Sequence, residues 1–241
     1  MAEVKPYKDK EGSKKEQVAE MFDNISHRYD FLNRLLSLGI DKIWRRKAIR
    51  LLKPYSPETI LDIASGTGDF ALAAIKIKPK KIVGVDISKG MLEIGEKKIQ
   101  KRKLQHIISF QEGDSEKLNF SDEEFDAITV GFGVRNFENL NSGLKEMYRV
   151  LKHNGHVVVL EFSKPRKFPI KQLFRFYSRY IIPAAGKSIS KDKRAYTYLP
   201  ESVAAFPEGK AFIQILESIG FREVKSNMVS GGIATIYTGK K

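Results

Sequence analysis

The stretch Ile60-Leu-Asp-Ile-Ala-Ser-Gly-Thr-Gly-Asp-Phe-Ala-Leu-Ala-Ala74 decides the fold of this chain of 241 residues. A short apolar run gives way to small residues at 64–68, and a helical pattern begins at Asp69. The predicted order is strand, tight loop, helix. Gly66 and Gly68 allow backbone dihedrals that a Cβ would forbid, and they leave room for a ligand. Because the helix N-terminus points at the same place, the stretch predicts a nucleotide-sized cradle.

The loop alone does not identify the nucleotide that it would bind. Gly66-x-Gly68-x-x-Ala71 fits the dinucleotide fingerprint, but a single match of this kind is weak. Two details favour S-adenosylmethionine instead. Asp62 ends the strand, a position typical of the carboxylate that methyltransferases keep near the methionine end of that cofactor. S-adenosylmethionine has no phosphate, so the loop needs no third glycine. The alternative is an ordinary glycine-rich turn.

Composition limits the class of protein. A mass of 27.4 kDa suits one α/β domain with a substantial core. No apolar run approaches the roughly 20 residues that span a bilayer, and the N-terminus lacks the apolar centre of an export signal. The absence of cysteine excludes disulfides, thiolate zinc sites and a cysteine nucleophile. A cytoplasmic location is therefore the default expectation.

Two amphipathic helices are predicted before the cradle. The first ends at Gly39, and the second runs from about Asp41 and stops before Pro54. The apolar positions of the first recur at helical spacing: Val18, Met21, Phe22, Ile25 and Tyr29. These helices either only pack against the core or also roof the site.

The rest of the chain alternates strands and helices. Strands are predicted at 81–86, 107–111, 125–130 and 156–162, with a turn at 152–155 and a closing antiparallel pair at 221–228 and 233–238. Helices are predicted from 87 to 99, from about 141 to 151, and from about 210 to 219. This pattern predicts an α/β fold with a doubly wound, mostly parallel sheet whose ligand binds at the carboxyl ends of the strands.

Polar residues follow two of these strands at the positions that a nucleoside needs. Asp86 ends its strand at a spacing from Gly68 close to that of an acid that binds ribose hydroxyls. Asp114 is placed to accept a hydrogen bond from an adenine amino group, and the backbone N–H of Ser115 to donate to a ring nitrogen. The alternative for Asp86 is a simple helix cap.

Residues 163–209 form an insertion that is too long for a simple connection. It holds ten Lys or Arg against three acids, while the whole chain has a net charge of +14 and a pI near 9.7. Phe and Tyr residues are interleaved with the cations. This combination fits an interfacial membrane contact or stacking with nucleic acid. The third interpretation is a basic helical lid packed over the domain.

Taken together, four stretches resemble the class I S-adenosylmethionine-dependent methyltransferases: Asp62 to Asp69, Val85 to Leu92, Phe132 to Asn136, and Arg149-Val-Leu-Lys. More narrowly, the chain resembles the UbiE/MenG quinone C-methyltransferases from about residue 14 to its end. The motifs that carry this resemblance are Phe22-Asp-Asn-Ile-Ser-His-Arg-Tyr-Asp30 with Asn33, Gly133-Val-Arg-Asn136, and Leu160-Glu-Phe-Ser163.

The resemblance implies a single methyltransferase domain with a seven-stranded Rossmann-like sheet. Its parts would be N-terminal helices (14–53), a cofactor-binding core (54–162), a basic aromatic lid insertion (163–209), and a closing helix with the strand pair (210–241). S-adenosylmethionine would be the cofactor. The implied cofactor-binding residues are Asp62, Gly66, Thr67, Gly68, Asp86, Asp114 and Ser115.

The resemblance also implies the reaction, which is methylation of a ring carbon of a prenylated quinol. Demethylmenaquinol is the expected acceptor, and the polyprenyl-methoxybenzoquinol of ubiquinone biosynthesis is a second one. Tyr29, Arg135 and Asn136 match positions that line the reacting quinol. A carbon ortho to a phenolate is already nucleophilic. The enzyme must therefore align the two reactants, exclude water and help to remove the phenol proton, and none of this needs a metal. Arg135 is expected to stabilise the phenolate, with His27 a candidate proton relay.

Two other functions stay open besides a non-catalytic module that binds the cofactor. The first is methylation of oxygen or nitrogen on another small molecule. The second is nucleic-acid binding or methylation, although base-amino methyltransferases carry a proline-containing motif where this chain has Gly131-Phe-Gly-Val. Since the quinol resides in the bilayer, we expect weak, peripheral contact with the inner membrane surface and no nucleic-acid partner. A homodimer is compatible with the sequence.

Overall fold

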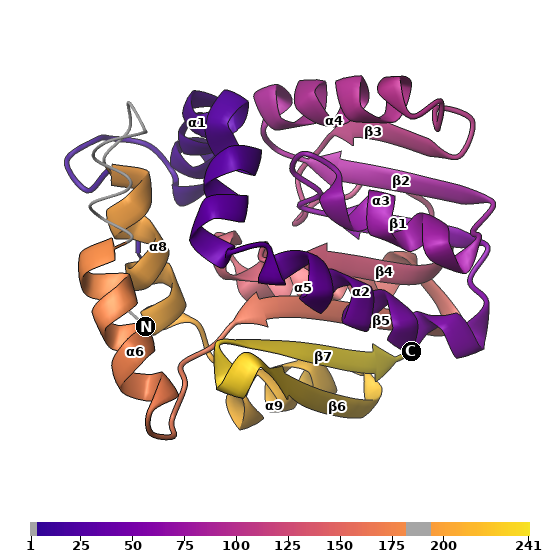
Figure 1. Ribbon diagram of the computed structural model, residues 1–241. Coiled ribbons are helices and arrows are strands. Elements are labelled where there is room, and N and C mark those ends of the chain that lie inside the picture. The colour runs from indigo at the N-terminus through magenta and orange to yellow at the C-terminus, as the bar shows by residue number, and fades with distance from the viewer. Residues whose placement is uncertain (1–3, 182–193) are drawn as a thin grey trace.

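The computed structural model describes residues 4–181 and 194–241. At its centre lies a seven-stranded sheet in the order β3-β2-β1-β4-β5-β7-β6 (Figure 1). Strands β1 to β5 pair in parallel, and β7 is antiparallel to both of its neighbours, β5 and β6. This confirms the predicted sheet and its closing antiparallel pair. The strands are β1 (Thr59–Ile63), β2 (Lys81–Asp86), β3 (Ile108–Glu112), β4 (Phe125–Gly131), β5 (Leu151–Phe162), β6 (Arg222–Val229) and β7 (Ala234–Lys240).

Helices cover both faces of the sheet. The α-helices are α1 (Lys14–Ser37), α2 (Ile40–Leu52), α3 (Asp69–Ala74), α4 (Lys89–Lys101), α5 (Leu140–Val150), α6 (Ile170–Phe176), α8 (Arg194–Ala205) and α9 (Lys210–Ile219). Short 3₁₀ turns are η1 (Lys53–Tyr55), η2 (Ile75–Ile77), η3 (Val134–Asn136) and η5 (Ser230–Gly232), and η4 (Tyr177–Ile181) is a π-helical turn.

The alternation of side chains along β1 explains the two layers. Leu61 and Ile63 pack into a cluster with residues of α5 and α9, whereas Ile60 packs with residues of α2 and α3 on the other face. Because successive residues of a strand point to opposite faces, one apolar strand supplies two cores. Asp62 lies between these residues and is fully buried.

The sheet has a switch point between β1 and β4, where the strand order reverses. Helix α1 packs against α4 beside this point. Asp23 of α1 accepts hydrogen bonds from the Ser88 hydroxyl at 2.6 Å and from the Gly90 N–H at 2.8 Å, at the start of α4. The first helix is therefore fixed beside the edge of the sheet where open α/β sheets bind ligands.

One predicted boundary differs from the structure. The turn expected at 152–155 belongs to β5, which begins at Leu151. The pairing of β4 with β5 shifts register between Phe125 and Ala127, and this irregularity accommodates the extra residues.

The insertion supplies α6, η4 and α8, which lie beside α1 (Figure 1). Residues 182–193 of the predicted lid are outside the described residues. Within 4–181 and 194–241, every helix is too short or too polar to cross a lipid bilayer.

Candidate active site

A first cavity lies at the carboxyl ends of β1, β2 and β4. Of the predicted cofactor-binding residues, Gly66, Asp86, Asp114 and Ser115 line it. Helix α1 closes it with Lys15, Val18, Phe22 and Tyr29. Of the two alternatives for the first helix, the structure therefore favours the one in which it also covers this cavity.

The backbone of Gly66 fits a closely bound ligand. Its φ of 55° lies in the left-handed region, and a Cβ added there would meet no atom within 4 Å. A side chain would therefore project into open space that the cavity provides, at the cost of a strained backbone. Small residues at Gly113, Gly131 and Gly133 complete this part of the lining. The acids of its lining supply the acceptors that hydroxyl and amino groups of a nucleoside need.

Asp86 holds the loop as well as lining the cavity. Its Oδ2 accepts from the Gly66 N–H at 2.7 Å, and its Oδ1 accepts from the Ser88 N–H at 2.8 Å. Burial raises the pKa of Asp86 to about 6, although these amides favour the charged form. Each oxygen keeps a further lone pair, so the carboxylate can also accept from a ligand hydroxyl.

Asp114 is paired with α1. Its Oδ2 forms an ion pair with Lys15 Nζ, and its Oδ1 accepts from the Glu116 N–H at 2.9 Å. The hydrogen bond to Asp114 raises the pKa of Lys15, so the cation is firmly charged at neutral pH. The adenine end of the predicted site therefore carries a cation that the sequence motifs did not include.

Asp62 does not line this cavity. Its carboxylate accepts from the Thr129 hydroxyl at 2.7 Å and from the Ala71 N–H of α3 at 3.2 Å. Full burial raises its pKa to about 7, against the effect of those two hydrogen bonds. Asp62 thus joins β1, β4 and α3 beneath the loop, and the first turn of α3 is bound by this carboxylate.

Thr67 and Gly68 also face away from the cavity. The Thr67 hydroxyl donates to Asp30 of α1 at 2.6 Å and accepts from Lys98 Nζ at 2.8 Å. Lys98 forms ion pairs with Asp30 at 2.6 Å and with Asp69 at 2.8 Å. We call Asp30, Thr67, Asp69 and Lys98 the α1 clasp. Gly68 is required for packing, because a Cβ there would lie 2.5 Å from the Phe110 ring.

A second, larger cavity of about 1090 Å³ lies between α1, α6 and α8. Its lining is mostly apolar and includes Met21, Ile25 and Leu32 of α1, Leu173 and Phe176 of α6, and Leu199 and Val203 of α8. An apolar cavity of this size fits a hydrophobic ligand much larger than a single ring.

The two cavities share three aromatic residues, Phe22, Tyr29 and Phe132. Phe22 and Tyr29 meet edge to face with centroids 6.0 Å apart. Phe132 stacks on Phe162 at 4.4 Å, and Trp44 lies 6.2 Å from Phe132. Burial raises the pKa of the Tyr29 phenol, so it is neutral at physiological pH. The two cavities therefore meet at neutral aromatic rings, and we call the place lined by Phe22, Tyr29 and Phe132 the junction.

Arg135 lines the second cavity and is almost fully buried. Its Nη1 donates to Glu161 Oε1 at 2.9 Å and to the Phe132 carbonyl, and its Nε donates to the Ser202 hydroxyl at 3.3 Å. Within residues 4–181 and 194–241, Nη2 makes no hydrogen bond. Two N–H donors of a fixed cation are therefore available to a ligand.

Asn136 lines the first cavity, so neighbouring residues of η3 serve different cavities. Its Oδ1 accepts from the buried Tyr198 hydroxyl of α8 at 3.2 Å. His27 is exposed and lines neither cavity. The structure therefore gives no support to the predicted proton relay.

Glu161 and Lys15 are the two site residues whose roles the sequence motifs did not reveal. Glu161 has a usable signal, because it is an acid inside an otherwise apolar run of β5. Lys15 has none, since it is one of many lysines in a polar N-terminal segment.

Comparison with known proteins agrees with this geometry. The model of the ubiE/COQ5 methyltransferase family matches residues 10–241. The demethylmenaquinone methyltransferase of Bacteroides fragilis is 51% identical over 239 residues, which covers 99% of this chain and 97% of the relative. The ubiquinone/menaquinone biosynthesis C-methyltransferase UbiE of Geotalea uraniireducens is 45% identical over 95% of this chain and 97% of its own length.

A solved structure supports the fold. The S-adenosylmethionine-dependent methyltransferase of Thermotoga maritima superposes with a TM-score of 0.63 at 20% identity, covering 92% of this chain and 99% of that one.

Proposed function

We propose that this chain, which belongs to the ubiE/COQ5 methyltransferase family, transfers a methyl group from S-adenosylmethionine to a ring carbon of demethylmenaquinol. One observation carries the proposal: a glycine-lined cavity with acids at its rim meets a large apolar cavity at Phe22, Tyr29 and Phe132. A donor and an apolar acceptor would meet at these rings. The name of the Bacteroides fragilis relative supports the naphthoquinol, and that of the Geotalea relative supports a ubiquinone precursor as a second acceptor.

The cofactor would occupy the first cavity. Asp86 would accept from its ribose hydroxyls, Asp114 from the adenine amino group, and Gly66 would let it approach the backbone. When bound, S-adenosylmethionine supplies an electrophilic methyl group on a sulfonium. Asp62, Thr67 and Gly68 would contribute by holding the loop in shape, since their side chains or backbone face away from the cavity.

The acceptor ring would lie at the junction, with its prenyl chain in the apolar cavity. A phenolate makes the ortho carbon a good nucleophile, so the residues must favour ionisation and exclude water. The Nη2 donors of Arg135, which make no hydrogen bond within the described residues, would stabilise such an anion. Tyr29 and Asn136 would orient the two reactants, and the aromatic rings would keep the junction dry.

The acceptor is a membrane lipid, so the proposal includes reversible docking on the inner membrane surface. Leu173 and Phe176 line the apolar cavity and are 64% and 58% exposed, and Phe168 in the same segment is 80% exposed. The segment also carries exposed cations: Lys164, Arg166, Lys167, Lys171, Arg175 and Arg179. Exposed aromatic and basic side chains on one segment are typical of interfacial membrane contacts.

The quinones of cells that lack this protein test the pathway. Accumulation of demethylmenaquinone, reversed by the intact gene, supports the naphthoquinol. Accumulation of an unmethylated benzoquinone alone would assign the ubiquinone branch. Unchanged quinones would favour the alternative of another small-molecule methyltransferase.

A further inference from the structure

Glu161 is an acid at a place where an apolar residue would be expected. It lies near the end of β5 with no exposed surface, between Leu160 and Phe162. Burial of a carboxylate is costly unless it is paired. A buried ion pair also adds little net stability compared with apolar residues of the same size. Folding alone therefore does not explain this residue.

The contacts of Glu161 converge on Arg135. Its Oε1 accepts from Arg135 Nη1 at 2.9 Å and from the Phe162 N–H at 2.8 Å, and its Oε2 accepts from the Arg135 backbone N–H at 3.4 Å. One carboxylate thus fixes both the side chain and the main chain of Arg135. Phe162 supports the same guanidinium, whose carbon lies 5.5 Å from the ring centroid.

We propose that Glu161 is a positioning residue for methyl transfer, which holds the Arg135 guanidinium with Nη2 toward the acceptor. The role of the acceptor in this statement rests on the proposed function. Glu161 lines neither cavity, so it acts through Arg135 and not by contact with the reacting atoms.

Other ionisable groups surround the pair and are the same in every variant below. Tyr198 of α8, Tyr29 of α1 and Tyr237 of β7 all have phenols whose pKa is raised by burial, so they are neutral through the physiological range. Lys14 donates to the Arg135 carbonyl at 3.2 Å. Burial raises the pKa of Glu161, while Arg135 and the N–H group of Phe162 oppose that shift. The only ionisable groups that change on substitution are therefore Glu161 and Arg135.

The experiment is a double-mutant cycle with Glu161→Gln, Arg135→Gln and the double variant, each assayed for methylation of demethylmenaquinol. We expect Glu161→Gln to lower kcat roughly 100-fold through misplacement of the guanidinium, with the KM for S-adenosylmethionine within about twofold. In the Arg135→Gln background the same change should cost no further activity. The double variant also avoids an unpaired buried charge, so it keeps the test valid if Glu161→Gln folds poorly.

A second readout does not depend on turnover. 4-Nitro-1-naphthol, whose naphtholate absorbs visible light, is titrated when bound to each protein. Glu161→Asp keeps the charge, but its shorter side chain should displace the guanidinium from the bound naphtholate. The apparent pKa of the bound naphthol should therefore rise by about one unit in Glu161→Asp, while kcat falls. Glu146→Gln, which breaks an Arg–Glu pair away from both cavities, is the matched control.

Multiplicative losses of kcat in the cycle would overturn the inference, as would an unchanged naphthol titration in Glu161→Asp or failure of the naphthol to bind the wild-type protein. A wild-type protein that does not methylate demethylmenaquinol would refute the proposed function, whereas the naphthol titration would still decide the role of Glu161.

Discussion

At the scale of single residues, Asp62 shows that a residue of the predicted cofactor-binding motif can have a structural role. Its folded pKa of about 7 exceeds the ordinary value of 3.8, so the native state binds more protons than the unfolded state between these values. The free energy of unfolding therefore falls as the pH rises through this window. Asp62→Asn removes the titration, and its amide can still bond Thr129 and the Ala71 N–H.

We expect the stability of Asp62→Asn relative to wild type to increase between pH 5 and pH 7 by on the order of a few kcal/mol, and to level off above pH 7. Urea unfolding across this range measures it. A difference that stays flat would show that the Asp62 carboxyl is not desolvated in the folded protein.

Asp86 gives a second prediction at this scale. Asp86→Ala should weaken S-adenosylmethionine binding by roughly 1.5–3 kcal/mol, because a buried acceptor of charge-assisted hydrogen bonds is lost. Calorimetric titration provides the affinity. Asp86→Asn is the matched control, since it can still accept from the Gly66 N–H and should bind more tightly than Asp86→Ala. Unchanged affinity in both variants would remove Asp86 from the ribose role.

These residues also mark how far sequence reasoning reached. Spacing along strands and loops was sufficient to place Gly66, Asp86, Asp114 and Ser115 at the cavity, because it determines which residues reach the carboxyl edge of the sheet. It could not give the direction of Asp62 or Thr67. Those directions depend on partners that are distant in sequence, Thr129 and Asp30, and no local pattern encodes that pairing.

At the scale of elements, α1 is held over the cofactor loop by the α1 clasp. Burial alone would raise the pKa of Asp69, but Lys98 and Arg45 hold it below its usual value. Lys98→Met leaves Asp30 and Asp69 without this shared cation. We expect α1 to open more often, with S-adenosylmethionine affinity lowered about tenfold and faster hydrogen exchange in α1.

Lys101 is exposed at the end of α4, the helix that carries Lys98. Lys101→Met is the matched control and should change neither the affinity for S-adenosylmethionine nor hydrogen exchange in α1. Equal exchange in α1 for Lys98→Met and wild type would mean that apolar packing alone holds the helix.

Apolar periodicity was sufficient to predict α1 and α2, since their stripes face the core. It did not predict that β5 starts at Leu151, because the irregular pairing with β4 extends a strand through polar residues that read as a turn.

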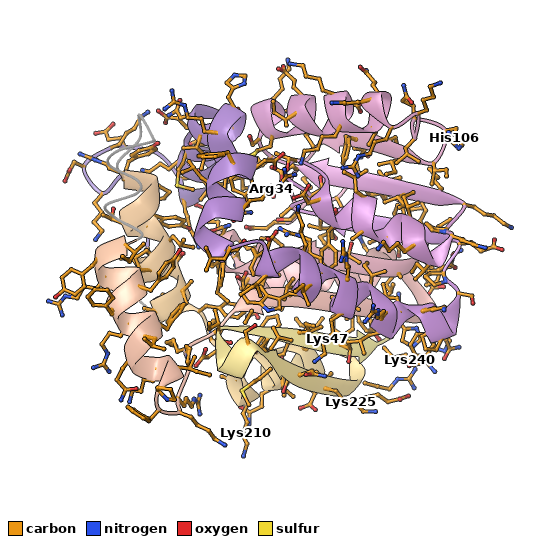
Figure 2. The ribbon with its side chains drawn as sticks, viewed as in Figure 1. Arg34, Lys47, His106, Lys210, Lys225 and Lys240 are labelled. Atoms are coloured by element: carbon orange, nitrogen blue, oxygen red, sulfur yellow. The ribbon has the colours of Figure 1, made fainter. Side chains whose placement is uncertain are left out.

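At the scale of the whole molecule, half of the excess positive charge lies in the insertion, because ten cations less three acids give +7 of the total of +14. Figure 2 labels four lysines that do not line the apolar cavity, Lys47, Lys210, Lys225 and Lys240. The segment 164–181, which contains α6 and η4, combines exposed cations with the exposed side chains of Phe168, Leu173 and Phe176. The sequence predicted a basic aromatic insertion, but composition could not tell which of its residues face outward.

We therefore expect weak, salt-sensitive binding to anionic vesicles, since each Lys or Arg near the surface contributes about 1 kcal/mol at most. Sedimentation with phosphatidylglycerol and with phosphatidylcholine vesicles at low and high salt measures it. Leu173→Ala with Phe176→Ala should weaken binding, whereas Tyr55→Ala, an exposed aromatic away from the insertion, should not. Equal binding to both lipids would contradict docking by charge, and tight binding to RNA would revive the nucleic-acid alternative.

The most direct test of the central claim is transfer of a ¹³C-methyl group from labelled S-adenosylmethionine by the purified protein. The acceptors are demethylmenaquinol, a polyprenyl-methoxybenzoquinol, and a small-molecule panel with free hydroxyl or amino groups. We expect label on a ring carbon of demethylmenaquinol, and strong loss of that product in Arg135→Ala with cofactor affinity preserved. Label on oxygen or nitrogen, or no label on either quinol, would contradict the account.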